Sequence, residues 1–208
     1  MSDCVFCDEV ETREFIVNGK SLGNRVIFES NNFVVFPALG QIVEGYLLIV
    51  SKEHHISTCV FSDDLFSEFH FVKEKVKEVL ASYYQPPLFF EHGATSLSNK
   101  GGCCIDHAHI HAVPIRVNLF EELSKNFSYN QIYSYDKVQE YYGKNLPYFL
   151  IENNLSERYL FEVNSQVSSQ YIRRIIADKI GKPDIWDWRK HYGLDELLKT
   201  IEKLKDKF

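Results

Sequence analysis

Three histidines occur at alternate positions near the middle of the chain, in the segment GGCCIDHAHIHAVP of residues 101–114. They are His107, His109 and His111, and the chain of 208 residues holds only 8 histidines in all. Residues two apart share one face of a β-strand, so the spacing predicts a strand with three imidazoles on one face, successive ones roughly 6–7 Å apart. Because each buried ring nitrogen needs a partner, such a face indicates a functional site rather than packing.

Two kinds of chemistry fit three imidazoles on one face: a metal cluster, or nucleophilic and acid–base catalysis. Imidazole can attack phosphorus directly and form a phosphoramidate intermediate, which splits one difficult displacement into two easier ones. Neighbouring imidazoles can bind phosphoryl oxygens or protonate the leaving group. Gly101 and Gly102, just upstream, suit the phosphorus chemistry, because glycine lets backbone N–H groups approach a phosphate closely.

The elements that must position these histidines follow from hydrophobic patterning. Short apolar runs predict strands at 25–30, 31–38, 46–51 and 88–93, in addition to the histidine strand. Ser62 and two following aspartates begin an amphipathic helix that ends near Tyr83, before Pro86 and Pro87. Strands in short-loop succession with one long helix predict an α+β fold with an antiparallel sheet.

A change in pattern near residue 118 predicts two regions, 1–118 and an extension over 119–208 that packs on the first. In the extension we expect short helices near 119–125 and 135–142, a strand pair at 147–152 and 158–163, a helix within 165–183, and a last helix over 194–206. The extension is therefore expected to be α/β. Of the adjacent Arg173 and Arg174, at most one reaches a bound phosphate, because neighbours on a helix point about 100° apart. Trp186 and Trp188 stack a base or fasten the extension to the core.

Composition excludes several classes of protein. A net charge of −6 argues against an extended basic surface for nucleic acid, although a local basic pocket is compatible with it. The longest strongly apolar run, residues 46–50, is too short for a membrane span, and the N-terminus lacks a basic-then-apolar signal. We therefore expect no membrane partner and a cytoplasmic location. The 5 cysteines are then expected to be free thiols or metal ligands.

The segment DHAHIHAVP resembles the signature of the histidine-triad (HIT) family of nucleotide hydrolases and transferases. EGYLLIVSKEH and LFFEHG…GGCCIDH are similar to the strands and the glycine loop around it, so the resemblance covers about residues 4–115. It implies a HIT-like sheet and an enzyme that acts at a nucleoside α-phosphate through a covalent nucleotidyl-histidine intermediate. The implied substrates are dinucleoside polyphosphates or nucleoside phosphoramidates, with hydrolysis favoured over nucleotidyl transfer.

The resemblance also assigns roles. His109 matches the nucleophile, and His111 matches the residue that contacts the phosphate or the leaving group. With Gly101 and Gly102, Cys104 lies where relatives place a group that touches phosphate, although a small buried thiol is the other interpretation. Ala38 occupies a position where several relatives carry an aspartate that holds the ribose, so that contact is missing.

Many bacterial members of the family open with Cys-x-x-Cys and bind zinc. The matching residues here are Cys4, Cys7, His54 and His107, with His55 as a competitor for His54. The resemblance therefore implies a structural Cys₂His₂ zinc site that fastens the N-terminus to the histidine strand.

Other functions and assemblies stay open at this point. A non-catalytic nucleotide- or RNA-binding module is the main alternative, as in splicing-associated relatives, and a metal-dependent hydrolase that uses all three histidines as ligands is another. Small HIT proteins commonly form homodimers, and the extension either replaces or decorates such a dimer.

Overall fold

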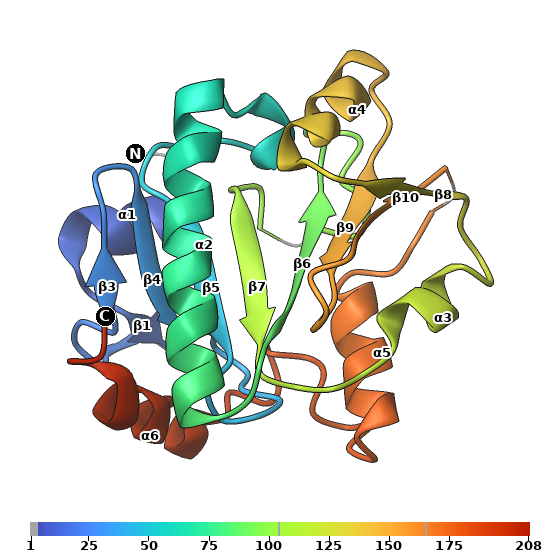
Figure 1. Cartoon of the computed structure of the whole chain (residues 1–208). Coiled ribbons are helices and arrows are strands. Elements are labelled where there is room, and N and C mark those ends of the chain that lie inside the picture. Colours follow the sequence, from blue (N-terminus) through green and yellow to red (C-terminus); the bar gives the residue numbers. More distant parts are fainter. Residues whose placement is uncertain (1–3, 104, 165) are drawn as a thin grey trace.

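The computed structural model describes residues 4–103, 105–164 and 166–208 (Figure 1). Its helices are α1 (Val5–Thr12), α2 (Asp63–Tyr83), α3 (Leu119–Leu123), α4 (Gln139–Gly143), α5 (Tyr171–Lys179) and α6 (Leu194–Leu204), with 3₁₀ turns η1 (Thr58–Val60) and η2 (Tyr135–Val138). Its strands are β1 (Ile16–Val17), β2 (Lys20–Ser21), β3 (Phe28–Glu29), β4 (Phe33–Pro37), β5 (Leu47–Ser51), β6 (Leu88–Gly93), β7 (His109–Val113), β8 (Tyr129–Ile132), β9 (Tyr148–Glu152) and β10 (Arg158–Glu162).

A single 8-stranded sheet forms the centre of the molecule, in the order β3-β4-β5-β7-β6-β9-β10-β8. Every neighbouring pair in it is antiparallel. Strands β1 and β2 form a separate hairpin next to α1. The α+β fold with an antiparallel sheet and one long packed helix is therefore confirmed.

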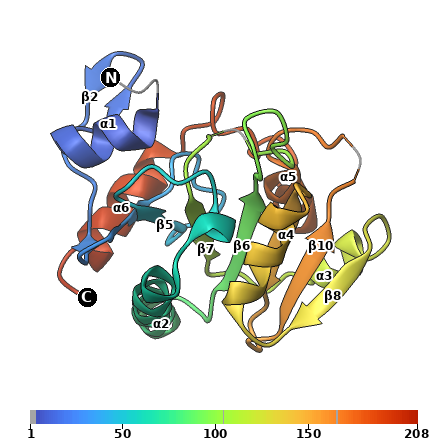
Figure 2. The same ribbon diagram turned by 90° about the horizontal axis from the view of Figure 1, so that it is seen from above.

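Helices cover both faces of the sheet (Figure 2). On one face α2 and α4 pack over a core that includes Phe69, Val72 and Tyr141. On the other face α1, α3 and α5 pack over a second core that includes Phe6 and Ile172. The long helix begins where the sequence predicts, because the Ser62 hydroxyl accepts a hydrogen bond from the Leu65 amide at 3.3 Å and so caps its N-terminus.

The extension continues the same sheet. Strand β9 pairs with β6 along its length, with Phe90 opposite Ile151, and β10 and β8 follow on its outer side. Both edges of β6 are thus occupied within one chain, by β7 and β9. A second copy of the chain therefore cannot add to the sheet at β6. Among the described residues, no helix combines the length and apolar character that a membrane span requires.

The buried carboxylate of Glu91 lies on the α2 face of β6, opposite the histidines. It accepts hydrogen bonds from the Thr58 amide at 2.8 Å, the Thr58 hydroxyl at 2.6 Å and the Tyr148 hydroxyl at 2.9 Å. None of these donors carries a charge. Burial therefore raises the pKa of Glu91 to about 7, and the three hydrogen bonds only partly oppose that rise.

This raised pKa predicts how stability depends on pH. A carboxyl whose pKa is higher in the folded than in the unfolded state stabilises the fold most below about pH 4.5, and this contribution is lost as the pH rises through 7. We expect Glu91→Gln to remove about 2 kcal/mol of pH dependence between pH 5 and pH 8. Urea unfolding at both pH values measures it, with the exposed Glu78→Gln as control. Equal pH dependence of wild type and Glu91→Gln would contradict the assignment.

Candidate active site

The histidine strand is shorter than the sequence predicts. Strand β7 begins at His109, and His107 lies just before it in an irregular segment. The reason is that the backbone before His109 does not continue the regular pairing with β5. The Ala108 amide donates to the carbonyl of His55, in the loop after β5, and the Ala108 carbonyl accepts from the Ser51 amide. The three rings still lie near one another, and the Phe6 ring meets both His107 and His109 edge-on, at 5.8 and 5.3 Å between centroids.

His109 is held in one orientation and one tautomer. Its Nδ1 lies 2.6 Å from the His107 carbonyl oxygen, which only accepts hydrogen bonds, so Nδ1 carries the proton. The Nε2 lone pair is therefore available, and the ring lines a cavity of about 710 Å³. Burial lowers the pKa of His109, which keeps the imidazole neutral.

His111 lies next to His109, with 4.9 Å between the ring centroids. Its ring stacks on Phe90 at 4.2 Å, and its Nδ1 is 2.6 Å from the Tyr46 hydroxyl oxygen. Burial holds the pKa of His111 well below its usual range, and nearby positive charge, including that of Arg173, contributes. The ring is consequently a fixed, neutral imidazole.

His92, on the neighbouring strand β6, also lines the cavity. Its Nε2 accepts a hydrogen bond from the Ile172 amide of α5 at 3.3 Å, and its ring lies 6.2 Å from that of His111. Burial lowers the pKa of His92 to about 3. His92 thus joins the extension to the histidine face as a neutral acceptor.

The four residues expected to bind metal come together at one end of β5. In the group formed by Cys4, Cys7, His54 and His107, the ligand atoms all lie within 4.8 Å of one another. The Cys4 sulfur is 3.3 Å from His107 Nδ1, and the Cys7 sulfur is 3.2 Å from His54 Nδ1. His55 is outside this group and contacts Glu53 and Phe61 instead.

The separations within this group are compatible with a closed tetrahedral metal site. Around a zinc ion, sulfur and imidazole ligands lie about 3.3–3.8 Å from one another, close to the separations found here. The second nitrogen of His107, Nε2, is 2.7 Å from the Ser51 carbonyl oxygen and donates to it. That hydrogen bond fixes the tautomer in which Nδ1 faces the two sulfurs, as is usual behind a metal-binding imidazole.

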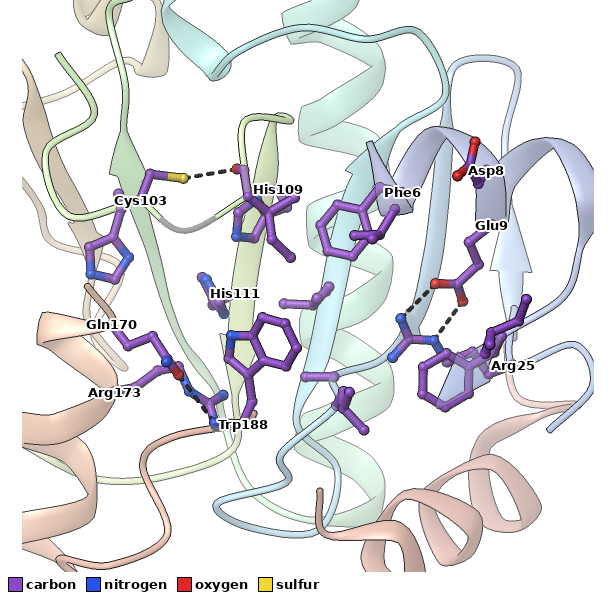
Figure 3. A pocket seen from close by; sticks show the side chains of 18 of the residues that line it. Phe6, Asp8, Glu9, Arg25, Cys103, His109, His111, Gln170, Arg173 and Trp188 are labelled. Carbon is purple, nitrogen blue, oxygen red and sulfur yellow. Dashed lines mark hydrogen bonds and ion pairs between the residues drawn. The ribbon is translucent and has the colours of Figure 1, made fainter. Parts of the chain in front are cut away.

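A cavity of about 710 Å³ lies over the histidine face (Figure 3). Three parts of the chain form its walls: the N-terminal segment, the strands of the sheet, and the extension. The N-terminal segment contributes α1 and the residues that follow it. Helix α1 was not predicted from the sequence. Residues from these three parts that line the cavity include Phe6, Glu9, Phe15, Leu48, His109, His111, Gln170, Arg173 and Trp188.

The loop before β7 also reaches this cavity. Gly102 and Cys103 line it, whereas Gly101 is not among the lining residues. Gly101 and Gly102 both have a positive φ, of 55° and 78°, which favours glycine at each position. Cys104 lies outside the described residues, so its expected role stays a prediction. Ala38 lines the cavity, so the position where several relatives carry an aspartate offers no carboxylate here.

Two pairs of residues in the extension were discussed from the sequence, and in each pair one member lines the cavity and the other does not. Arg173 is 3% exposed and lines the cavity, whereas the guanidinium of Arg174 stacks on the Trp186 ring at 4.3 Å. Trp188 lines the cavity and Trp186 does not. Gln170, which the sequence did not single out, donates its amide to Asp187 and accepts from the Trp188 backbone.

The antiparallel sheet, the long helix α2 and the alternating histidines beside a cavity give the chain an α+β, HIT-like fold. Comparison with known proteins agrees. A model of the family described as "Protein similar to CwfJ C-terminal" matches residues 1–128, and the chain belongs to this family. The chain is also similar to "Protein hit" of Bacillus subtilis (strain 168), at 23% identity over 115 residues, which are 54% of this chain and 70% of that protein.

Several solved structures resemble the chain more distantly. A hypothetical histidine triad nucleotide-binding protein from Sulfolobus tokodaii is 20% identical, with 53% of this chain and 68% of that chain covered and a TM-score of 0.43. A Zn-bound histidine triad family protein from Mycobacterium smegmatis is 14% identical, with 69% and 92% covered and a TM-score of 0.43. Because these scores are below 0.5, no functional conclusion follows from them.

Proposed function

We propose that the protein is a nucleotide hydrolase that cleaves the bond between a nucleoside α-phosphate and its leaving group, with His109 as the nucleophile. The observation that carries this proposal is the orientation of one side chain. The Nδ1 proton of His109 is donated to the His107 carbonyl, and the ring lines a cavity of about 710 Å³. An imidazole held in this way presents its Nε2 lone pair to a bound phosphate.

The reaction then has two displacements. In the first, a bond forms between His109 Nε2 and the α-phosphorus as the bond from phosphorus to the leaving group breaks, and the leaving group takes the electron pair. In the second, the oxygen of a water attacks the same phosphorus, the N–P bond breaks, and its electron pair returns to Nε2. The water loses a proton to solvent or to a nearby base. The products are a nucleoside monophosphate and the free leaving group.

His111 assists without becoming charged. We assign the Tyr46 hydroxyl as the donor to Nδ1 across 2.6 Å, which places the proton of His111 on Nε2, where it is available to a phosphoryl oxygen or to the leaving group. The stacked Phe90 ring, at 4.2 Å, holds the imidazole in that position. A hydrogen bond fixed before the substrate arrives stabilises the transition state at no cost of reorganisation.

The metal proposed for the N-terminal site is zinc, held by Cys4, Cys7, His54 and His107. Two sulfurs and two imidazole nitrogens form a closed structural donor set, and the distances between them support this assignment. Zinc would supply cross-linking rather than Lewis-acid chemistry at the substrate. The ring of Phe6, on α1 between the two cysteines, lies against His109, so this site also supports the cavity wall.

A panel of substrates tests the proposed function. Dinucleoside polyphosphates, nucleoside 5′-phosphoramidates and adenylated nucleic-acid ends are each incubated with the protein in the absence of added metal. We expect turnover of at least one class, with a nucleoside monophosphate as product. Inactivity on the whole panel, together with measurable nucleotide or RNA binding, would instead indicate the non-catalytic binding module.

A further inference from the structure

Arg173 is a buried cation that has no acidic partner among the described residues. Its Nε donates to the Trp186 carbonyl at 2.9 Å and its Nη2 to the Gly40 carbonyl at 2.6 Å, and both acceptors are neutral. No carboxylate of residues 4–103, 105–164 or 166–208 lies within ion-pair distance of it. The other buried cations differ, since Arg25 pairs with Glu9 at 2.6 Å and Lys73 with Glu152 at 2.8 Å.

An uncompensated buried charge is costly, and proteins keep one mainly where an anion binds. At 3% exposure, and lining the cavity, Arg173 meets that condition, since an anion in the cavity would supply the missing charge. Guanidinium groups bind phosphate with two parallel hydrogen bonds, so a phosphate is the anion that the group fits best.

The position of Arg173 relative to the histidines indicates which phosphate it meets. Its guanidinium carbon lies 5.2 Å from the centre of the Tyr46 ring, and the Tyr46 hydroxyl contacts His111. Among the labelled residues of Figure 3, His111 lies between His109 and Arg173. Arg173 therefore lies at the His111 end of the row, away from the nucleophile.

The surroundings hold Arg173 in place before any ligand binds. Gly40 has a φ of 72°, and a Cβ there would lie 2.8 Å from the Arg173 Nη2 and 2.5 Å from the Trp188 Cβ. Only glycine leaves room for this close approach between the loop after β4 and the extension. In Figure 3 the side chains of Gln170, Arg173 and Trp188 converge on the side of the cavity nearest His111.

We propose that Arg173 binds a phosphate of the leaving group, so that the preferred substrates are nucleotides joined to their leaving group by a P–O–P anhydride bond. This inference rests on the proposed function. As the N–P bond to His109 forms, the bond from the α-phosphorus to the bridging oxygen breaks. The departing phosphate takes the electron pair and leaves as an anion, whose growing charge Arg173 stabilises. The nitrogen of a phosphoramidate takes the electron pair and a proton from solvent and leaves as a neutral amine, which offers Arg173 no such charge.

The experiment compares two substrates that share one nucleoside, a dinucleoside polyphosphate and a nucleoside phosphoramidate. Arg173→Gln is expected to lose about 100-fold in kcat/KM on the polyphosphate, as for removal of one charge-stabilising donor. On the phosphoramidate, the same variant is expected to lose about 10-fold or less in kcat/KM. Arg173→Lys should recover part of the loss, because it keeps the charge but not the planar fork. Arg174→Gln, next along the helix and stacked on Trp186, is the matched control and should change neither rate.

Equal losses on the two substrates would overturn the inference, because they would give Arg173 a structural or general phosphate role. Binding of inorganic pyrophosphate, measured by calorimetry, separates this inference from the proposed function. If wild type turns over nothing but binds pyrophosphate at least about 10-fold more tightly than Arg173→Gln does, the proposed reaction fails and the phosphate site stands. If wild type and Arg173→Gln bind pyrophosphate equally, the site is refuted.

Discussion

His109→Ala is expected to lower kcat by at least about 10⁴-fold, equivalent to about 5.5 kcal/mol of transition-state stabilisation, on whichever substrate the wild type turns over. The reason is that Nε2 of this ring forms the bond to phosphorus, and no neighbour replaces it. His111 Nδ1 is engaged with Tyr46, its Nε2 carries the proton in the proposed tautomer and so has no lone pair to offer, and His92 Nε2 accepts from the Ile172 amide. Steady-state kinetics on purified protein measures the loss.

Nucleotide affinity should change little in the same variant, because a nucleophile contributes mainly to the transition state. Equilibrium binding of a nucleoside monophosphate to wild type and His109→Ala checks this. His70→Ala is the control, since His70 is exposed on α2, across the sheet from the site. Retention of more than about a tenth of the wild-type kcat by His109→Ala would remove His109 from the mechanism.

Loss of the N-terminal metal site is expected to have the largest effect on stability. Cys7→Ser should purify without zinc and melt about 10 °C lower than the zinc-loaded wild type. A structural zinc contributes directly to folding, and each kcal/mol corresponds to about 2–4 °C in a chain of this size. Metal analysis and thermal unfolding measure the two effects. Treatment of wild type with a chelator should lower the melting temperature in the same way.

Cys59→Ser is the matched control for this variant. Cys59 is a buried free thiol that contacts Ser57 and lies outside the group of Cys4, Cys7, His54 and His107. Its substitution should leave the zinc content at one ion per chain. The proposed metal site would be contradicted if wild type contained no zinc after expression with zinc present and had the same melting temperature as Cys7→Ser.

The parts of the site that the sequence predicts are those carried by local pattern. A two-residue period indicated that His109 and His111 share a face, and both line the cavity. The long helix was predictable because Ser62 caps it and its apolar residues recur at helical spacing. The group of Cys4, Cys7, His54 and His107 was expected only from the family resemblance, because no local rule relates residues about 50 positions apart.

The parts that the sequence did not predict depend on contacts between distant segments. Helix α1 is short and contains β-branched residues, and it is held in place by Phe6 against the histidines and by the buried pair Glu9–Arg25. Arg173 reaches the carbonyl of Gly40 across 133 positions of sequence. Strand β8 was also missed, because most of its residues are exposed and polar, so it lacks an alternating pattern.

The most direct test of nucleophilic catalysis by His109 is a search for the covalent intermediate. Wild type and His109→Ala are mixed with substrate, quenched in base within the first turnover, and examined by intact-protein and peptide mass spectrometry. We expect wild type to gain the mass of one nucleotidyl group, located on the peptide that contains His109, and the variant to gain none. Rapid turnover without any adduct, or an adduct of equal yield in His109→Ala, would contradict nucleophilic catalysis by His109.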